Sequence, residues 1–91
     1  MKIIIKYLAK PQHKDALEKA LRSIIGITRK AHGCVQCDLH PSLDNRLVLF
    51  FDQLWESEDS WKQYLARKHM QEFTNQTEAM IDTIDTCVSE Y

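Results

Sequence analysis

The stretch Arg46-Leu47-Val48-Leu49-Phe50-Phe51-Asp52-Gln53-Leu54-Trp55 decides the fold, because five consecutive apolar residues within it leave no polar face. A strand that is apolar on both faces is typical of the interior of a sheet that is covered on both sides. We therefore predict a central strand over residues 46–55. Each of its faces needs something packed against it.

Two elements are predicted before this strand. Residues 2–9 contain Ile3-Ile4-Ile5 and then Tyr7, a composition that favours a first strand. Pro11 suits the first turn of a helix, and His32-Gly33 supplies its end. Between them lies a long amphipathic helix, although Gly26 falls inside it. Its apolar side is predicted to carry Ala16, Leu17, Ala20, Leu21, Ile24, Ile25 and Thr28.

The remaining elements follow from alternation and helix signals. Residues 34–40 alternate as a half-buried strand does, and residues 41–45 are typical of a turn. Ser57 is predicted to cap a helix whose Trp61, Tyr64 and Leu65 share one face. Beyond residues 67–68 a second helical stretch is predicted, and residues 83–90 form a fourth strand. The apolar side of that second stretch is predicted to carry Met70, Phe73, Thr77, Met80 and Ile81.

The resulting order, βαββαβ with the second helical region broken in two, predicts an α+β fold with an antiparallel sheet of the ferredoxin-like type. Helices on one face would leave the other sheet face bare. Because residues 46–55 are apolar on both faces, a second copy of the chain should cover it, which gives a homodimeric α/β barrel.

Length and composition narrow the function. Ninety-one residues hold one domain, predicted over residues 1–91. A net charge of −1, with both signs interspersed, provides no basic stripe for nucleic acid. No apolar run is long enough for a membrane span or a signal peptide, so we expect a soluble, cytoplasmic protein. Three cysteines do not close a disulfide framework and are expected to be reduced.

Three segments carry a resemblance to a known family: Asp52-Gln53-Leu54-Trp55-Glu56-Ser57, then Tyr64-Leu65, then Lys68-His69-Met70-Gln71-Glu72-Phe73. Together they resemble the antibiotic-biosynthesis-monooxygenase family, and its small quinol monooxygenases most closely. Gly33-Cys34 followed by Asp38-Leu39-His40 is similar to that family's second strand. The spacing of the elements agrees over essentially the whole chain.

The resemblance implies a dimeric α/β barrel with a pocket between sheet and helices in each subunit. Family enzymes oxidise electron-rich aromatics such as quinols and anthrones with molecular oxygen, using no metal, flavin or haem. We therefore expect a cofactor-independent monooxygenase that binds a small aromatic substrate, a quinol-like or polycyclic phenol, and oxidises it with molecular oxygen. The haem-degrading branch is a poorer match, since Tyr7 stands where that branch has an asparagine. Because one fold hosts many activities, the function has to be inferred from the residues of the site.

His69 is the candidate catalytic residue. It lies where the second helical region restarts, from where an imidazole could reach a pocket beside Trp55 and Tyr64. Histidine titrates near neutral pH, so it suits a base or proton shuttle for a phenolic proton, and a phenolate gives an electron to oxygen more readily than a phenol does. The alternatives left open are that His69 positions the substrate or orients the helix.

Four further residues are candidates for substrate binding. Trp55 and Tyr64 are expected to shape an aromatic pocket, with Trp55 as the residue that stacks on the substrate. His40 is either a second pocket group or an exposed residue. Asp52 lies among aromatic neighbours, so its carboxylate should face a wet cavity or find a partner.

Cys34 and Cys37 have the spacing of redox and zinc sites, but on a regular strand they point to opposite faces, so ordinary thiols are expected. Two other functions stay open. One is a non-enzymatic or stress-related dimer that binds a small apolar molecule in the same pocket. The other is chemistry on a phosphorylated signalling molecule, for which the sequence shows no compact cationic cluster.

Overall fold

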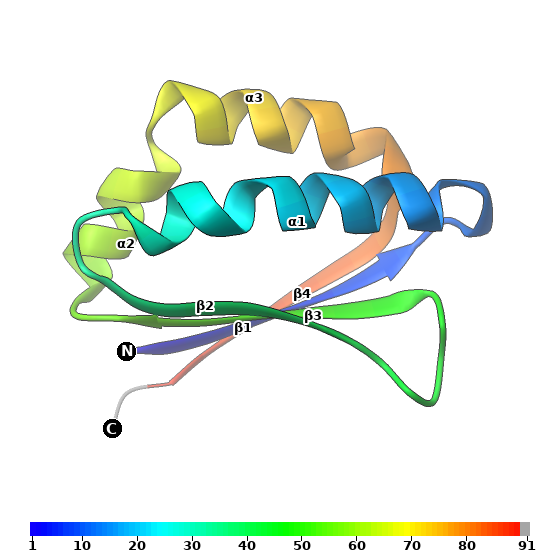
Figure 1. Cartoon of the computed structure of the whole chain (residues 1–91), viewed down its shortest axis with the longest axis horizontal. Coiled ribbons are helices and arrows are strands. Elements are labelled where there is room, and N and C mark those ends of the chain that lie inside the picture. The colour runs from blue at the N-terminus through cyan, green and yellow to red at the C-terminus, as the bar shows by residue number, and fades with distance from the viewer. Residues whose placement is uncertain (90–91) are drawn as a thin grey trace.

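The computed structural model describes residues 1–89 as one sheet covered on one face by helices (Figure 1). The elements are β1 (Lys2–Ala9), the 3-10 turn η1 (Pro11–His13), α1 (Lys14–Arg29), β2 (Cys34–Pro41), β3 (Val48–Trp55), α2 (Glu58–Leu65), α3 (Lys68–Thr77), the 3-10 turn η2 (Glu78–Met80) and β4 (Ile81–Ser89).

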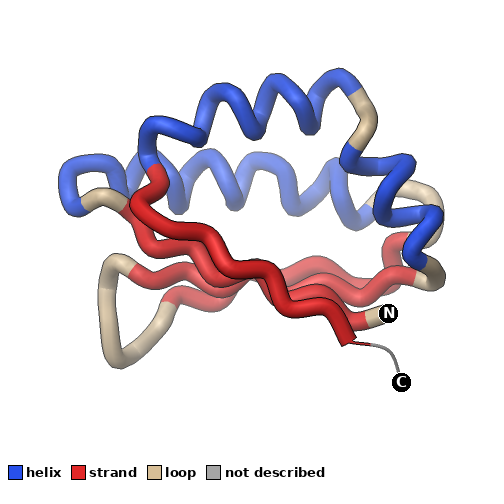
Figure 2. The backbone as a smooth tube through the Cα atoms, turned by 180° about the vertical axis from the view of Figure 1, so that it is seen from behind, coloured by secondary structure: helices blue, strands red, loops and turns tan. Residues whose placement is uncertain are grey.

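The four strands form an antiparallel sheet in the order β2-β3-β1-β4. The helices α1, α2 and α3 lie on the same side of it (Figure 2). This is the predicted ferredoxin-like α+β fold, which the structure confirms. β3 occupies an interior position, as its apolar sequence predicted, and it pairs with β1 through registers such as Ile3 with Gln53.

Local sequence signals explain where the helices begin. The Ser57 side chain accepts a hydrogen bond from the backbone N–H of Ser60, which confirms the predicted cap of α2. α1 buries Leu17, Leu21, Ile24 and Thr28 against the sheet. Gly33 follows α1 with a φ of +85°, a conformation that glycine adopts without strain.

Three predicted boundaries were wrong. β3 begins at Val48 rather than Arg46, because Asn45 holds the preceding turn: its side-chain oxygen accepts from the N–H of Leu47, and its carbonyl accepts from that of Val48. α3 ends at Thr77, so Met80 and Ile81 belong to η2 and β4 instead of the helix. The fourth strand begins at Ile81 instead of the predicted residue 83, and the residue predicted to end it, 90, lies outside the described residues.

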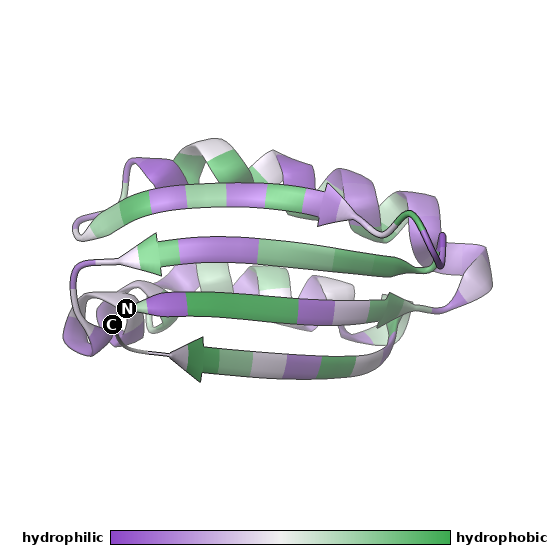
Figure 3. Ribbon diagram, turned by 90° about the horizontal axis from the view of Figure 1, so that it is seen from below, coloured by the Kyte–Doolittle hydropathy of each residue, from purple (hydrophilic) through white to green (hydrophobic). Residues whose placement is uncertain are grey.

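The sheet face opposite the helices is uncovered in the single chain (Figure 3). Ile4 of β1 is 36% exposed there. By strand register its neighbours on this face include Asp52 of β3 and Cys87 of β4. Within residues 1–89, no helix combines the length and apolar character that a bilayer crossing requires.

Candidate functional site

A cavity of about 190 Å³ lies between the sheet and the helices. β4 forms one side of it, and the side chains of Ile84 and Val88 on that strand remain about half exposed. A more open groove of about 350 Å³ adjoins it and shares Tyr7, Phe73, Thr74 and Ile84. The cavity is lined by Ile5, Tyr7, Ile24, Thr28, Phe51, Gln53, Trp61, Tyr64, Leu65, Met70, Phe73, Thr74, Ile84 and Thr86.

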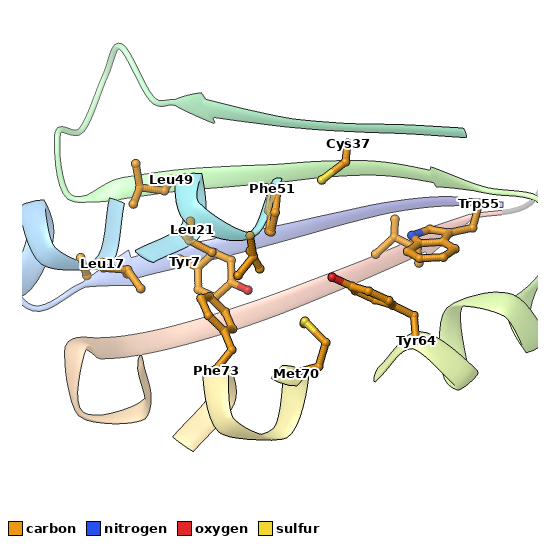
Figure 4. Packing of buried hydrophobic residues seen from close by; sticks show 13 residues of the cluster. Tyr7, Leu17, Leu21, Cys37, Leu49, Phe51, Trp55, Tyr64, Met70 and Phe73 are labelled. Carbon is orange, nitrogen blue, oxygen red and sulfur yellow. The ribbon is translucent and has the colours of Figure 1, made fainter. Parts of the chain in front are cut away.

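A short chain of polar groups borders this cavity. The Tyr64 hydroxyl of α2 lies 2.6 Å from Oγ1 of Thr28 and 3.3 Å from Nε2 of His69. The Tyr64 and His69 rings meet edge to face, with centroids 5.3 Å apart. Figure 4 shows the Tyr64 hydroxyl directed inward, between the sheet and Met70 of α3. The imidazole therefore reaches the cavity wall through the Tyr64 hydroxyl.

The hydrogen bonds of Thr28 show which groups donate and which accept among Thr28, Tyr64 and His69. Thr28 donates its single hydroxyl hydrogen to the carbonyl of Ile24, at 2.8 Å. Tyr64 must then donate to Thr28, and its oxygen accepts from Nε2 of His69. Burial raises the pKa of Tyr64, so its hydroxyl stays protonated near neutral pH. A proton that moves through Tyr64 would therefore have to arrive at its oxygen as the hydroxyl hydrogen leaves, so that no stable Tyr64 phenolate forms.

A second polar pair lies inside the apolar layer. Nε1 of Trp55 donates to Oε1 of Gln53 at 2.7 Å, and both side chains are buried. The Trp55 ring also packs against Tyr64, with centroids 5.3 Å apart and planes tilted by 38°. Trp55 thus supports both Gln53 and Tyr64.

The structure brings three of the predicted site residues together: Trp55, Tyr64 and His69. Trp55 is 1% exposed and lies behind the cavity lining, where it contacts Tyr64 and Gln53. His69 is partly buried and also lies behind Tyr64. These placements favour supporting roles for the Trp55 ring and the imidazole over direct contact with a bound molecule.

The other two predicted site residues, His40 and Asp52, lie on the opposite sheet face. Asp52 forms an ion pair with Lys2, and its second oxygen is 3.9 Å from Nε2 of His40. The His40 side chain is 60% exposed. The expectation that Asp52 finds a partner is confirmed. The structure does not bring this pair to the cavity that Tyr64 borders.

The two cysteines of β2 share a face, so the prediction that they point to opposite faces is wrong. A bulge at the start of β2 shifts the register, so that Cys34 pairs with Trp55 and Cys37 with Gln53. An extra residue in a strand reverses the alternation beyond it. Cys37 is buried, and burial raises the pKa of its thiol to about 12. A thiol of that pKa is a poor nucleophile.

Sequence reasoning missed Gln53 and Thr28. Gln53 gave a signal, since it lies between Phe51 and Trp55 on the same face of a predicted central strand, where a polar side chain needs a partner. Thr28 gave none beyond its place on the apolar side of α1. Its contact with Tyr64 joins residues 36 positions apart and becomes visible only in the folded chain.

Solved structures from bacteria share this fold. A protein from Pseudomonas aeruginosa is 23% identical, with a TM-score of 0.90 over 99% of this chain and 92% of its own. One from Shewanella oneidensis is 22% identical, with a TM-score of 0.89 over 94% and 84%. A candidate antibiotic biosynthesis monooxygenase from Deinococcus radiodurans is 17% identical, with a TM-score of 0.91 over 100% and 92%.

Likenesses at these identities concern the fold. No curated protein matches the sequence. The family model for antibiotic biosynthesis monooxygenase matches residues 1–76, which is most of the chain. The chain therefore belongs to the antibiotic biosynthesis monooxygenase family.

Proposed function

We propose that this protein is a cofactor-independent monooxygenase that oxidises a quinol-like or phenolic aromatic substrate with molecular oxygen. The observation that carries the proposal is the mainly apolar cavity bordered by the Tyr64 hydroxyl, which is joined to His69. An apolar cavity suits a flat aromatic ring, and a hydroxyl linked to an imidazole suits removal of a phenolic proton.

The size of the cavity limits the substrate. A protein cavity of about 150 Å³ binds benzene, and this one measures about 190 Å³. It therefore accommodates a single aromatic ring. A second or third fused ring would extend past Tyr7 and Phe73 into the adjoining groove of about 350 Å³.

Proton removal prepares the substrate for oxygen. For this step Nε2 of His69 must carry no hydrogen, and the Tyr64 hydroxyl turns its hydrogen from Thr28 toward that nitrogen. Tyr64 then takes the phenolic proton as its own hydrogen passes to Nε2. The resulting phenolate is the electron donor to oxygen. In the overall reaction a ring C–H and two O–H groups are oxidised: a para-quinol and one O₂ give a hydroxyquinone and one water. The substrate supplies all four electrons, so no external reductant enters the balance.

The proposed enzyme is a homodimer, in which a second copy covers the sheet face opposite the helices. Ile4 and the partly buried Phe50 and Leu54 form its apolar part, beside the Lys2–Asp52 ion pair. Apolar surface of this kind is stabilised by a partner. A second copy offers the same face, as symmetric dimers require.

The direct test is to incubate the purified, metal-free protein with a panel of quinols and anthrone-like phenols, in air and under argon. A hydroxylated product that forms only in air, with water and no hydrogen peroxide as the reduced form of oxygen, is the expected result. Autoxidation yields peroxide, so a protein-free incubation is the control. Identical products in air and under argon would contradict the proposal.

A non-enzymatic dimer that binds a small apolar molecule is the second candidate. The observation in its favour is that His69 lies behind Tyr64 and does not itself line the cavity. A ligand that raises the melting temperature but consumes no oxygen across the whole panel would favour this function.

A further inference from the structure

Gln53 places a polar side chain in a mainly apolar cavity wall. It lies on β3 between Phe51 and Trp55, with 6% of its surface exposed. An amide that is buried without full hydrogen bonding costs free energy, so both of its ends call for partners.

The contact with Trp55 identifies the two ends of the amide. An indole nitrogen only donates hydrogen bonds. The Gln53 atom that lies 2.7 Å from Nε1 of Trp55 must therefore be the oxygen. The nitrogen Nε2, with its two hydrogens, then occupies the other branch of the amide, away from the indole.

Nε2 makes no hydrogen bond to an acceptor within residues 1–89, and it is not one of their fully buried polar atoms without a partner, so it keeps some accessible surface. The hydroxyl groups of Tyr64 and Thr28 beside the same cavity are engaged with other partners, since Tyr64 donates to Thr28 and accepts from His69. Gln53 instead lines the cavity. Its oxygen is held by the protein, and its two N–H donors remain for whatever the cavity contains.

We infer that Nε2 of Gln53 is the donor that binds an oxygen atom of the aromatic ligand. A quinone carbonyl or a phenolate oxygen fits best, because each accepts hydrogen bonds and has no hydrogen to donate back. Trp55 is the positioning residue, since its N–H holds the amide in this orientation. The inference rests on the proposed function for the ligand class, and it assigns the group that selects an oxygenated ring over a hydrocarbon.

Binding of a matched pair of ligands tests this assignment. Duroquinone has a fully substituted ring, so it neither adds thiols nor undergoes ring hydroxylation, and durene is the same skeleton without the oxygens. Gln53→Glu keeps an acceptor for Trp55 but replaces the donor by a carboxylate. Gln63→Glu makes the same chemical change on the exposed side of α2 and is the control.

Calorimetry under argon should give about a tenfold or larger loss of duroquinone affinity in Gln53→Glu, the size expected for losing one hydrogen bond in a buried site. Durene affinity should change less than about twofold, and Gln63→Glu should match the unmodified protein for both ligands. An equal loss for both ligands, or no loss for duroquinone, would overturn the assignment.

The side-chain amide resonances of Gln53 give a second readout, in which binding is followed in the unmodified protein and a variant serves only to assign the signals. In a ¹⁵N spectrum, Gln53→Glu identifies these signals by their disappearance. They should shift on addition of duroquinone and much less with durene; unshifted signals at saturating duroquinone would overturn the assignment. Neither experiment involves turnover, so the assignment can fail while oxygenation is observed, and the reverse.

Discussion

The hydroxyl of Tyr64 accepts a hydrogen bond from Nε2 of His69 at 3.3 Å, while it donates to Thr28 at 2.6 Å. The shorter contact holds the phenol in place, and the longer one is the link that a proton transfer would use. Since His69 lies outside the cavity lining, a proton could pass between the imidazole and a bound ring only through the Tyr64 hydroxyl.

Tyr64→Phe should abolish this link while keeping the aromatic ring. If Tyr64 passes the substrate proton to His69, oxygen uptake should fall about a hundredfold or more, in the range that general acid–base groups contribute. Thr28→Val is the matched control, because it removes the other partner of the hydroxyl and leaves the link to His69. Equal losses in the two variants would mean that the hydroxyl only orients the ring.

Trp55→Phe should destabilise the fold beyond the loss of ring volume. The change removes the N–H that satisfies Oε1 of Gln53, and a buried acceptor left without its donor costs about 1–3 kcal/mol. Urea unfolding measures the change. The double variant Trp55→Phe with Gln53→Leu should recover part of the loss, because both polar partners are then absent; strict additivity would contradict a coupled pair.

The two glycines should respond in opposite ways to alanine. At Gly26 an added Cβ meets nothing within 4 Å, so Gly26→Ala should stabilise α1 by about 0.5–1 kcal/mol. At Gly33 the φ of +85° and an overlap with Ser60 Cβ and Oγ make alanine destabilising. Thermal unfolding of the two variants compares them directly. A lower melting temperature for Gly26→Ala would contradict the solvent-facing placement of this position.

The uncovered sheet face should control assembly. Ile4→Lys places a charge at the centre of that face, where it would be buried between two copies, and should convert a dimer to monomers. Leu43→Lys makes the same kind of change at a fully exposed turn residue and should leave assembly unchanged. Sedimentation velocity distinguishes the states. A monomeric unmodified protein would rule out the proposed homodimer.

Alkaline pH should destabilise the protein through buried acids. Burial raises the pKa of Cys37 from 9.0 to about 12 and that of Tyr7 from 10.0 to about 12. The unfolded chain releases these protons first, so stability is full below pH 9 and falls as the pH rises toward 12. Unfolding measured across this range, with Cys37→Ala as the variant, should show a shallower fall in the variant. The same slope in both proteins would contradict this role of Cys37.

The sequence predicted the fold well because the signals involved are local. The two-sided apolar character of β3, the cap at Ser57 and the stop at Gly33 each depend on a few neighbouring residues. The predictions that were wrong concern strand register and a strand boundary, each of which depends on a local irregularity in the backbone. The bulge in β2 moved Cys34 to the face of Cys37, and a turn held by Asn45 shortened β3.

The site was predictable only in part. Tyr64 and His69 are five positions apart in the chain, so their proximity follows from one short segment. That His40 lies away from the cavity was harder to predict from the sequence, because it depends on which face of the sheet the helices cover. Gln53 required knowledge of its partner Trp55 and of the cavity beside it.

Oxygen consumption measured with an electrode shows whether the protein oxidises a quinol and whether His69 takes part. The purified, metal-free protein, His69→Ala and the exposed-site control His32→Ala would each be given the same quinol panel, with the protein-free rate subtracted. We expect protein-dependent uptake for at least one quinol, lost in His69→Ala and retained in His32→Ala. No uptake across the panel, or uptake unchanged in His69→Ala, would contradict it.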